Sequence, residues 1–265
     1  MANIVITGST KGIGFGLARA FLDSGHKVVI SGRSESSVCE ALDRLRTPFC
    51  KCRGQACDIT DPAQVQALWD FAKIEFETID IWINNAGIAR TSWSILETPQ
   101  QEIDAMVHTN LQGTINGCRV AATGMQQQPS GKIFNILGGG SDGEYYPGMG
   151  IYGSTKRALD YFSDALAKEL DGTGILVGKI RPGMVITEAV IDEAKKNPEK
   201  FASTRPFMNN LVDQVDTVAK YLAQKMLDCN KTGQKIRWLT GGKIAARMLS
   251  GVVRKREDQF ARHGL

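Results

Sequence analysis

The sequence has few of the residues and patterns that mark metal-binding or disulfide-linked proteins. Its three histidines are scattered at positions 26, 108 and 263, and its six cysteines show no framework of paired spacings. Cys50, Cys52 and Cys57 are neighbours, but neither a second Cys-x-x-Cys nor a histidine pair completes a zinc ligand set. We therefore expect reduced thiols and no bound metal.

Long apolar runs, repeats and linkers are also missing. No apolar stretch reaches the roughly 18 residues that a membrane-spanning helix needs. No repeat, low-complexity tract or Pro/Gly-rich linker divides the 265 residues. The first apolar run begins at about Asn3, which leaves no room for a signal or transit peptide before it. These absences predict a single soluble domain with a cytoplasmic location.

The charge balance argues against a nucleic-acid-binding protein. The net charge is only +4 and the basic residues are spread along the chain, so a nucleic-acid partner is not expected. Residues 244–256 are a local exception, because apolar and basic residues mix there at helical spacing. Such a helix could rest on a membrane surface, but we favour packing on its own domain or on a neighbouring subunit.

Strand and helix patterns alternate regularly along the chain. With 42% hydrophobic residues the chain can bury a large core. The alternation predicts an α/β fold: a single doubly wound Rossmann domain over residues 1–265, with a mostly parallel sheet and helices on both faces. Residues 188–210 have the mixed polarity of a substrate lid. The expected strands lie near residues 3–7, 26–31, 53–59, 79–83, 132–137 and 175–180.

A glycine-rich turn directly follows the first strand and precedes a helical pattern. Glycines allow a tight turn and a close approach of a dinucleotide pyrophosphate. The free N–H groups and the positive dipole end of the following helix stabilise its charge. The expected cofactor-binding residues of this turn are Gly8, Ser9, Thr10, Lys11, Gly12, Ile13 and Gly14.

The residue after the second strand bears on which dinucleotide binds. NAD-binding folds tend to place an acid there for the ribose 2′-hydroxyl, whereas a cation suits the 2′-phosphate of NADP. This chain has Arg33 at that position, and Lys11 adds a second cation in the glycine turn. The expected cofactor is therefore NADP(H).

Tyr152 and Lys156 are four residues apart in a helical pattern, so they lie on one face of the helix, one turn from each other. A free phenol has a pKa of about 10, and a nearby ammonium favours the phenolate and lowers that pKa. A tyrosine tuned in this way can donate a proton to a carbonyl oxygen as hydride reaches the carbon. The pair therefore predicts carbonyl reduction or its reverse.

These motifs occur in the order and spacing of the short-chain dehydrogenase/reductases, a family that the chain resembles over nearly its whole length. The motifs are Thr7-Gly8 with Gly12 and Gly14, Asn84-Asn85-Ala86-Gly87, Asn110, Tyr152 with Lys156, and Arg181-Pro182-Gly183. The resemblance implies that Lys156 also holds the nicotinamide ribose and that Asn110 bonds a water on a proton route. It places these further residues at the cofactor: Asp58, Ile59, Asn85, Ala86, Gly87, Tyr152, Pro182, Gly183, Val185 and Thr187.

The resemblance also implies a quaternary structure. Family members commonly pair through two long helices that match residues 99–125 and 152–171, so we expect a homodimer or homotetramer. Asn110 lies in the middle of the first of these helices. Because asparagine has a poor helix propensity, something in the fold should compensate for it.

One position departs from the family pattern. The family usually has a serine about 13 residues before the tyrosine, where it hydrogen-bonds the substrate oxygen. The matching positions here are Gly138 and Gly139, and the nearest serine is Ser141. A rearrangement of the glycine-rich loop could bring the Ser141 hydroxyl inward, which makes it a candidate catalytic residue. The alternative is that a backbone N–H holds the substrate.

The departure narrows the resemblance to the chlorophyll b reductase branch of the family. The glycine-rich stretch with its serine, the segment at residues 181–187 and the segment at residues 236–243 all look like that branch. The resemblance implies NADPH-dependent reduction of a 7-formyl group to 7-hydroxymethyl on chlorophyll b or its chlorophyllide. Two alternatives stay open: a reductase of other carbonyls such as 3-oxoacyl thioesters, steroids or xenobiotic aldehydes, and a non-catalytic NADPH-binding sensor or scaffold.

Overall fold

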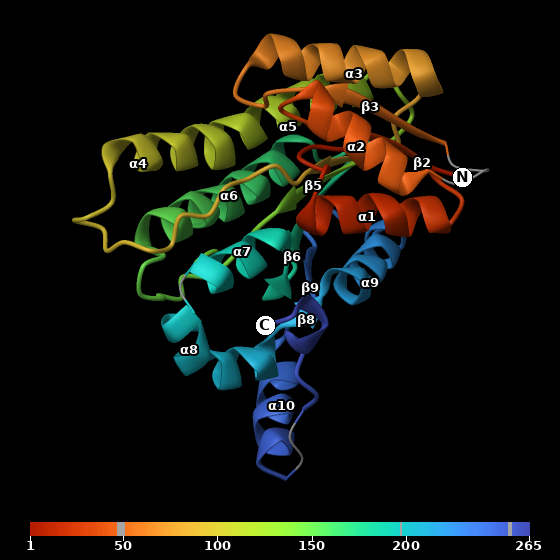
Figure 1. Ribbon diagram of the computed structural model, residues 1–265. Coiled ribbons are helices and arrows are strands. Elements are labelled where there is room, and N and C mark those ends of the chain that lie inside the picture. The colour runs from red at the N-terminus through yellow and green to blue at the C-terminus, as the bar shows by residue number, and fades with distance from the viewer. Residues whose placement is uncertain (47–50, 197, 254–255) are drawn as a thin grey trace.

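A parallel sheet of seven strands forms the centre of the computed structural model, which describes residues 1–46, 51–196, 198–253 and 256–265 (Figure 1). The strands lie in the order β3-β2-β1-β4-β5-β6-β9, and each neighbouring pair is parallel. This confirms the predicted α/β fold class. The strands are β1 (Asn3–Ile6), β2 (Lys27–Gly32), β3 (Cys52–Ala56), β4 (Ile81–Asn84), β5 (Gly131–Ile136), β6 (Ile175–Arg181) and β9 (Lys235–Arg237).

Helices cover both faces of the sheet, which is why its central strands are apolar on both sides. On one face α1 (Gly12–Asp23), α2 (Glu35–Leu45) and α9 (Val215–Leu227) share a core that includes Phe21 and Leu222. On the other face α3 (Pro62–Phe76), α5 (Thr114–Met125) and α6 (Gly150–Glu169) share a second core, in which the Trp69 and Trp82 rings are 6.0 Å apart.

The strand order places a topological switch point at the carboxyl ends of β1 and β4. From β1 the chain moves outward through β2 and β3, and then returns to the other side of β1 to form β4. The connections on the two sides therefore diverge, which is where open α/β sheets bind their ligands. The glycine turn follows β1 and residues 85–87 follow β4, so both motifs lie at this point.

A smaller unit forms outside the seven-stranded sheet. Its helices are α7 (Glu188–Lys196), α8 (Pro198–Leu211) and α10 (Gly241–Val253), and its two-stranded sheet is β7 (Val185–Ile186) with β8 (Asp213–Gln214). The segment expected to be a lid is thus a pair of helices, and its role as a lid stays a prediction. The chain end returns to α8, where the Phe260 and Phe201 rings are 4.9 Å apart.

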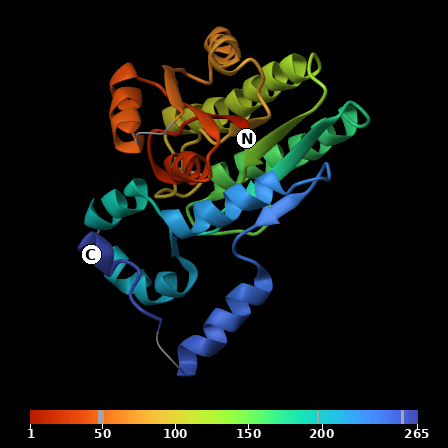
Figure 2. The ribbon, with the colours of Figure 1, turned by 90° about the vertical axis from the view of Figure 1, so that its right-hand side faces the viewer.

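Residues 244–253 of the basic carboxyl-terminal segment belong to α10, which projects from the rest of the molecule in both ribbon views (Figures 1 and 2). Arg247 on this helix pairs with the buried carboxylate of Asp213 at 2.9 Å, and Arg256 pairs with the same carboxylate at 2.5 Å. Residues 254 and 255 of the segment lie outside the described residues. Within the described part of the chain, no helix combines the length and apolar character needed to span a membrane.

The cysteines and acidic residues form no metal site in the described ranges, where no three His, Cys, Asp or Glu side chains are grouped to bind an ion. Cys50 lies outside those ranges. Cys57 is buried, and burial raises the pKa of its thiol to about 12.

Candidate active site

The turn between β1 and α1 is fixed against the segment that follows β4. Gly8 has a φ of +59°, and a Cβ there would lie 2.6 Å from the Ala86 Cα. A Cβ on Gly14 would lie 2.4 Å from the Asn85 side-chain nitrogen. That nitrogen donates to the carbonyl oxygens of Thr7 at 3.0 Å and of Gly8 at 2.8 Å. Only glycine permits this approach, so the turn has the shape expected of a dinucleotide site.

An anionic side chain occupies the amino terminus of α1. The Gly12 backbone N–H donates to the carboxylate of Glu188, the first residue of α7, at 2.9 Å. Thr187 adjoins the same turn, since its methyl carbon would lie 3.5 Å from a Cβ on Gly12. The carboxylate shows that this helix end accepts negative charge, which the diphosphate of NADP(H) also carries. The turn therefore fits the cofactor. No sequence pattern indicates Glu188.

We expect Glu188→Gln to lower the KM for NADPH by about twofold to tenfold. The carboxylate competes with a diphosphate for the Gly12 N–H and repels its charge, and the amide removes the repulsion. Steady-state kinetics with NADPH as the varied substrate measure the effect. Glu193→Gln, which makes the same charge change farther along α7, serves as the control. An unchanged or increased KM in Glu188→Gln would show that the contact does not oppose the cofactor.

The residues expected at the adenosine end of the cofactor lie beyond β2 and β3. Arg33 and Lys11 are both exposed, so their charges are available to a 2′-phosphate. Asp58 accepts hydrogen bonds from the backbone N–H and hydroxyl of Thr60, at 2.9 and 2.8 Å. Ile59 is buried beside it.

Asn110 is compensated by a local change of helix type. The helix expected over residues 99–125 runs without a break in the structure. Its middle part, Val107–Gly113, is π-helical and lies between α4 (Gln100–Met106) and α5. The Asn110 amide spans the Ile88 backbone, accepting from its N–H at 2.8 Å and donating to its carbonyl at 2.9 Å. It also donates to the Thr155 hydroxyl at 3.1 Å. These bonds fix Asn110 between the segment after β4 and α6.

Lys156 and Asn110 meet at Gly87. A Cβ on Gly87 would lie 3.1 Å from the Asn110 side-chain oxygen and 3.6 Å from the Lys156 Nζ. The Lys156 ammonium is buried and donates to the Ile136 carbonyl at the end of β5, at 3.0 Å. Its Nζ lies 5.8 Å from the centre of the Tyr152 ring. The structure therefore brings Tyr152, Lys156 and Asn110 together, as the sequence predicts.

The pKa of Tyr152 differs from the sequence expectation in its direction. Burial raises the pKa of the Tyr152 phenol to about 12 and lowers the pKa of the Lys156 ammonium to about 8. The expected lowering of the tyrosine pKa by the ammonium is not seen, because loss of hydration disfavours both charged forms. The phenol is therefore protonated at neutral pH, which is the state that a proton donor needs.

We expect Lys156 to make stability depend on pH. Because its pKa falls from 10.5 to about 8 on folding, the unfolded chain binds more protons between these values, and the free energy of unfolding rises with pH there. From pH 8 to 10 the wild-type protein should gain on the order of 2 kcal/mol relative to Lys156→Met. Denaturant unfolding of both cofactor-free proteins measures the difference. Parallel pH curves would contradict the expectation.

The Tyr152 hydroxyl lies against the end of β5. A Cβ on Gly138 would be only 2.1 Å from the hydroxyl oxygen and 3.0 Å from the ring carbon that carries it. The next glycine, Gly139, faces Met149 instead, whose terminal methyl carbon would be 2.8 Å from a Cβ. Gly138, one of the two glycines at the family's serine position, therefore makes room for the tyrosine itself.

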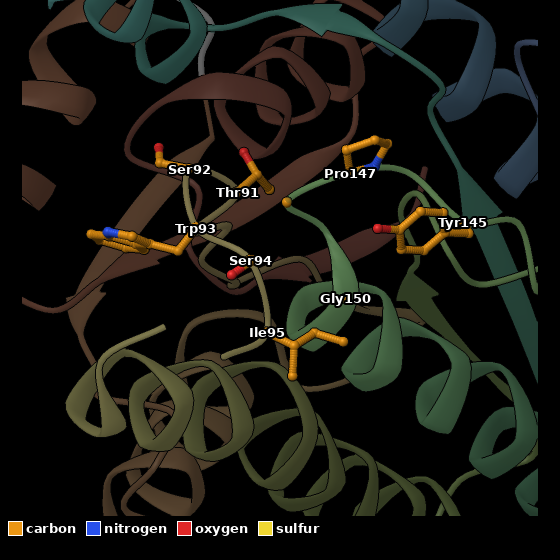
Figure 3. Close-up of a pocket in the computed structure, with 9 residues that line it drawn as sticks. Thr91, Ser92, Trp93, Ser94, Ile95, Tyr145, Pro147 and Gly150 are labelled. Atoms are coloured by element: carbon orange, nitrogen blue, oxygen red, sulfur yellow. The ribbon is translucent and has the colours of Figure 1, made fainter. Parts of the chain in front are cut away.

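An open pocket of about 450 Å³ lies between residues 91–95, which follow β4, and residues 145–150, which lead into α6 (Figure 3). Tyr145 and Ile95 point toward the space between the two segments, whereas the Trp93 ring points away from it in this view. The lining residues are Thr91, Ser92, Trp93, Ser94, Ile95, Tyr145, Pro147, Gly148 and Gly150.

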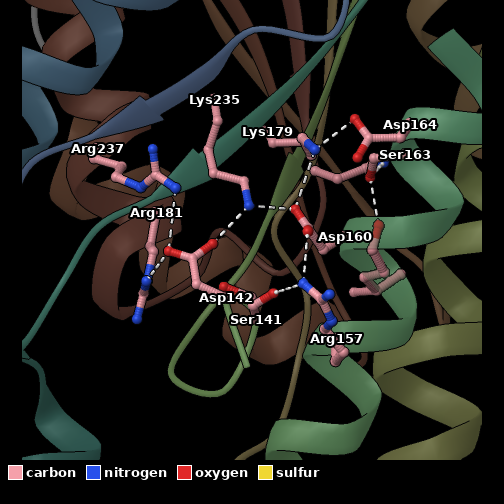
Figure 4. A network of polar contacts seen from close by, with 12 residues as sticks. Ser141, Asp142, Arg157, Asp160, Ser163, Asp164, Lys179, Arg181, Lys235 and Arg237 are labelled. Atoms are coloured by element: carbon pink, nitrogen blue, oxygen red, sulfur yellow. Dashed lines mark hydrogen bonds and ion pairs between the residues drawn. The ribbon is translucent and has the colours of Figure 1, made fainter. Parts of the chain in front are cut away.

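Ser141 lies in the loop between β5 and α6, where it is buried next to a network of charged side chains (Figure 4). Its carbonyl accepts a hydrogen bond from Arg157 at 3.1 Å, and its hydroxyl has no hydrogen-bond partner among the described residues. The neighbouring Asp142 pairs with Arg181, and also with Lys235 at 2.7 Å. These ion pairs hold the loop in place and keep the pKa of the Asp142 carboxyl well below its usual range.

The structure gives no hydrogen bond between Ser141 and Tyr152 within the described residues, so the catalytic role of Ser141 stays a prediction. It requires the loop to move away from the ion pairs of Asp142. A Ser141→Ala variant that retained full turnover would remove the role.

The residues expected at the nicotinamide end follow β6. Pro182 is buried, and Gly183 has a φ of +76°, where a Cβ would lie 2.7 Å from the Leu239 Cβ. Val185 is buried in β7. Their contact with the cofactor stays a prediction.

Comparisons with known proteins agree with this geometry. Residues 2–198 match the model of a family described as short chain dehydrogenase. The chain is 38% identical to the chloroplastic chlorophyll(ide) b reductase NOL of Oryza sativa subsp. japonica, covering 94% of this chain and 75% of the relative. It is also 38% identical to the chloroplastic NOL protein of Arabidopsis thaliana, with 94% and 73% covered.

The fold is shared with solved structures that contain the expected cofactor. The structure of ElxO with NADP bound superimposes with a TM-score of 0.81 at 27% identity, covering 92% of this chain and 99% of that one. The family model, the relatives and this neighbour point to the same family and the same cofactor. The chain belongs to the short-chain dehydrogenase/reductase family and is an NADP(H)-dependent oxidoreductase.

Proposed function

We propose that this protein uses NADPH to reduce the 7-formyl group of chlorophyll b or chlorophyllide b to a hydroxymethyl group. The observation that carries the proposal is the placement of Tyr152 and Asn110 beside Lys156, next to Gly87, in a chain 38% identical to two proteins named chlorophyll(ide) b reductase. A protein that only binds NADPH has no need for all three residues.

The phenol of Tyr152 is the proton donor in this mechanism. Bound NADPH supplies the hydride to the carbonyl carbon. Because burial raises the pKa of Tyr152 to about 12, the phenol carries its proton at neutral pH and can hydrogen-bond the carbonyl oxygen before transfer. The proton then neutralises the negative charge that develops on that oxygen, and the product is an alcohol.

Lys156 and Asn110 support the tyrosine. The ammonium of Lys156 lies one helical turn from Tyr152 and stabilises the phenolate that proton donation leaves behind. The Asn110 side chain is fixed by Ile88 and Thr155, which places it beside Lys156 near Gly87. In this position it can hold a water through which the lysine and then the phenolate regain a proton.

Three further properties belong to the proposal. The protein assembles as a homodimer or homotetramer through α4 and α5 on one side and α6 on the other. The exposed Tyr161 on α6 and the exposed Val107 in the π-helical segment between α4 and α5 support that surface. We propose a cytoplasmic location, although the two relatives are named chloroplastic. Membrane contact through α10 is disfavoured, because Arg247 is used in pairing with Asp213.

Anaerobic incubation of the purified protein with NADPH and chlorophyllide b tests the proposed function, with products followed by chromatography. We expect the 7-hydroxymethyl product. A panel of simple aldehydes and ketones is run in parallel. Turnover of the panel without the pigment would assign a general carbonyl reductase, and NADPH binding without any turnover would assign a sensor.

A further inference from the structure

The pocket between residues 91–95 and 145–150 is connected to the catalytic hydroxyl by a series of glycine contacts. Gly150 begins α6, whose first turn carries Tyr152, and a Cβ on Gly150 would lie 2.5 Å from an Ile95 side-chain carbon. A Cβ on Gly148 would lie 2.3 Å from the Thr91 carbonyl oxygen. The absent side chains let the two segments touch, so they form one wall that ends at the active tyrosine.

The inner side of this wall reaches the end of β5. A Cβ on Gly139 would lie 3.7 Å from the Tyr146 ring, and Gly138 contacts the Tyr152 hydroxyl directly. Gly150, which lines the pocket, lies two residues before Tyr152 in the first turn of α6, so the pocket lies close to the proton donor. A carbonyl group that reaches Tyr152 can belong to a molecule whose remaining part lies in the pocket.

The chemistry of the lining restricts what that remaining part can be. None of the nine lining residues carries a formal charge. Two large hydrophobic side chains are exposed at its rim, with Tyr145 75% and Ile95 57% accessible to solvent. Exposed side chains of this kind at a concave surface mark ligand sites, and the absence of cations disfavours phosphate-bearing acyl carriers. A volume of about 450 Å³ open to solvent suits a large ligand that is only partly enclosed.

We propose that this pocket binds the flat, uncharged ring system of the substrate and that Tyr145 determines specificity by stacking on it. The inference rests on the proposed function and gives it a substrate class: an extended conjugated ring with an aldehyde at its edge. The ring lies between Tyr145 and Ile95 while the aldehyde reaches Tyr152. Small aldehydes do not reach Tyr145 and gain nothing from it.

Competition between two substrates tests the role of Tyr145. For each variant the kcat/KM for chlorophyllide b is divided by that for benzaldehyde. We expect Tyr145→Ala to lower this ratio at least tenfold, through a higher KM for the pigment, because the pigment ring can no longer stack on the Tyr145 ring. Tyr145→Phe keeps the ring and should retain the ratio. Ile74→Ala is the control, since Ile74 is 80% exposed on α3 outside the pocket.

A binding measurement separates failure of this inference from failure of the proposed function. A chlorophyllide with a methyl group in place of the formyl group cannot be reduced, and its binding is followed by fluorescence quenching. Tyr145→Ala should weaken its binding at least tenfold even if the wild-type protein reduces no pigment. An unchanged Kd, or no binding to the wild-type protein, would overturn the inference. So would normal pigment reduction with an unchanged ratio in Tyr145→Ala.

Discussion

Tyr152→Phe is expected to lower kcat for carbonyl reduction by about 10³-fold while leaving the affinity for NADPH within a few fold. General acid catalysis contributes roughly 10² to 10⁴ in rate, and phenylalanine removes the proton donor but keeps the ring. Burial alone shifts the pKa of the phenol, and its hydroxyl makes no hydrogen bond among the residues that the structure describes, so the variant should fold normally. Single-turnover kinetics with saturating NADPH measure the chemical step directly.

The control for this substitution is Tyr161→Phe, which removes a hydroxyl from an exposed tyrosine of the same helix. It should turn over as the wild-type protein does. If Tyr152→Phe kept more than a tenth of the wild-type kcat, another group would be the proton donor and the proposed mechanism would be wrong.

Gly138→Ala is expected to lower kcat about 100-fold or more without abolishing NADPH binding. The added Cβ would lie 2.1 Å from the Tyr152 hydroxyl oxygen, so the ring must move, and a displacement of about 1 Å at a reacting group costs on the order of 10²-fold in rate. Gly138 does not have a positive φ, so alanine fits the backbone and the effect is steric. Cofactor binding by fluorescence titration, together with kcat, separates displacement of the tyrosine from unfolding.

Gly139→Ala is the matched control for Gly138→Ala. Its Cβ would lie 2.8 Å from the terminal methyl carbon of Met149, which ends a flexible side chain and can move. We expect it to lose less than tenfold in kcat. Equal losses in the two variants would show that general loop disruption, rather than displacement of Tyr152, limits the rate.

The parts of the site that depend on neighbouring residues in the chain could be predicted from the sequence. Strand, glycine turn and helix follow one another between residues 3 and 23, so their geometry is local. The placement of Tyr152 and Lys156 one turn apart needs only the period of a helix. The order of parallel strands then brings these motifs to one edge of the sheet, as open α/β folds require.

The parts that depend on contacts between distant segments could not be predicted. Glu188 contacts Gly12 across 176 positions, and no pattern in the sequence links the two. The sequence shows that Gly138 departs from the family's serine. Only the packing of α6 on β5 shows that this position faces the Tyr152 hydroxyl. The spacing of Tyr152 and Lys156 reveals a neighbouring charge and so predicts a lower pKa for the tyrosine, whereas the burial that raises this pKa is a property of the whole fold.

The most direct test of the proposed function follows the hydride. The wild-type protein is incubated under anaerobic conditions with chlorophyllide b and NADPH that carries deuterium in the transferable position, and the product is analysed by mass spectrometry. We expect one deuterium on the 7-hydroxymethyl carbon, with no labelled product from Tyr152→Phe on the same timescale. An unchanged pigment in the presence of bound NADPH, or a reduced pigment without deuterium on that carbon, would contradict the proposal.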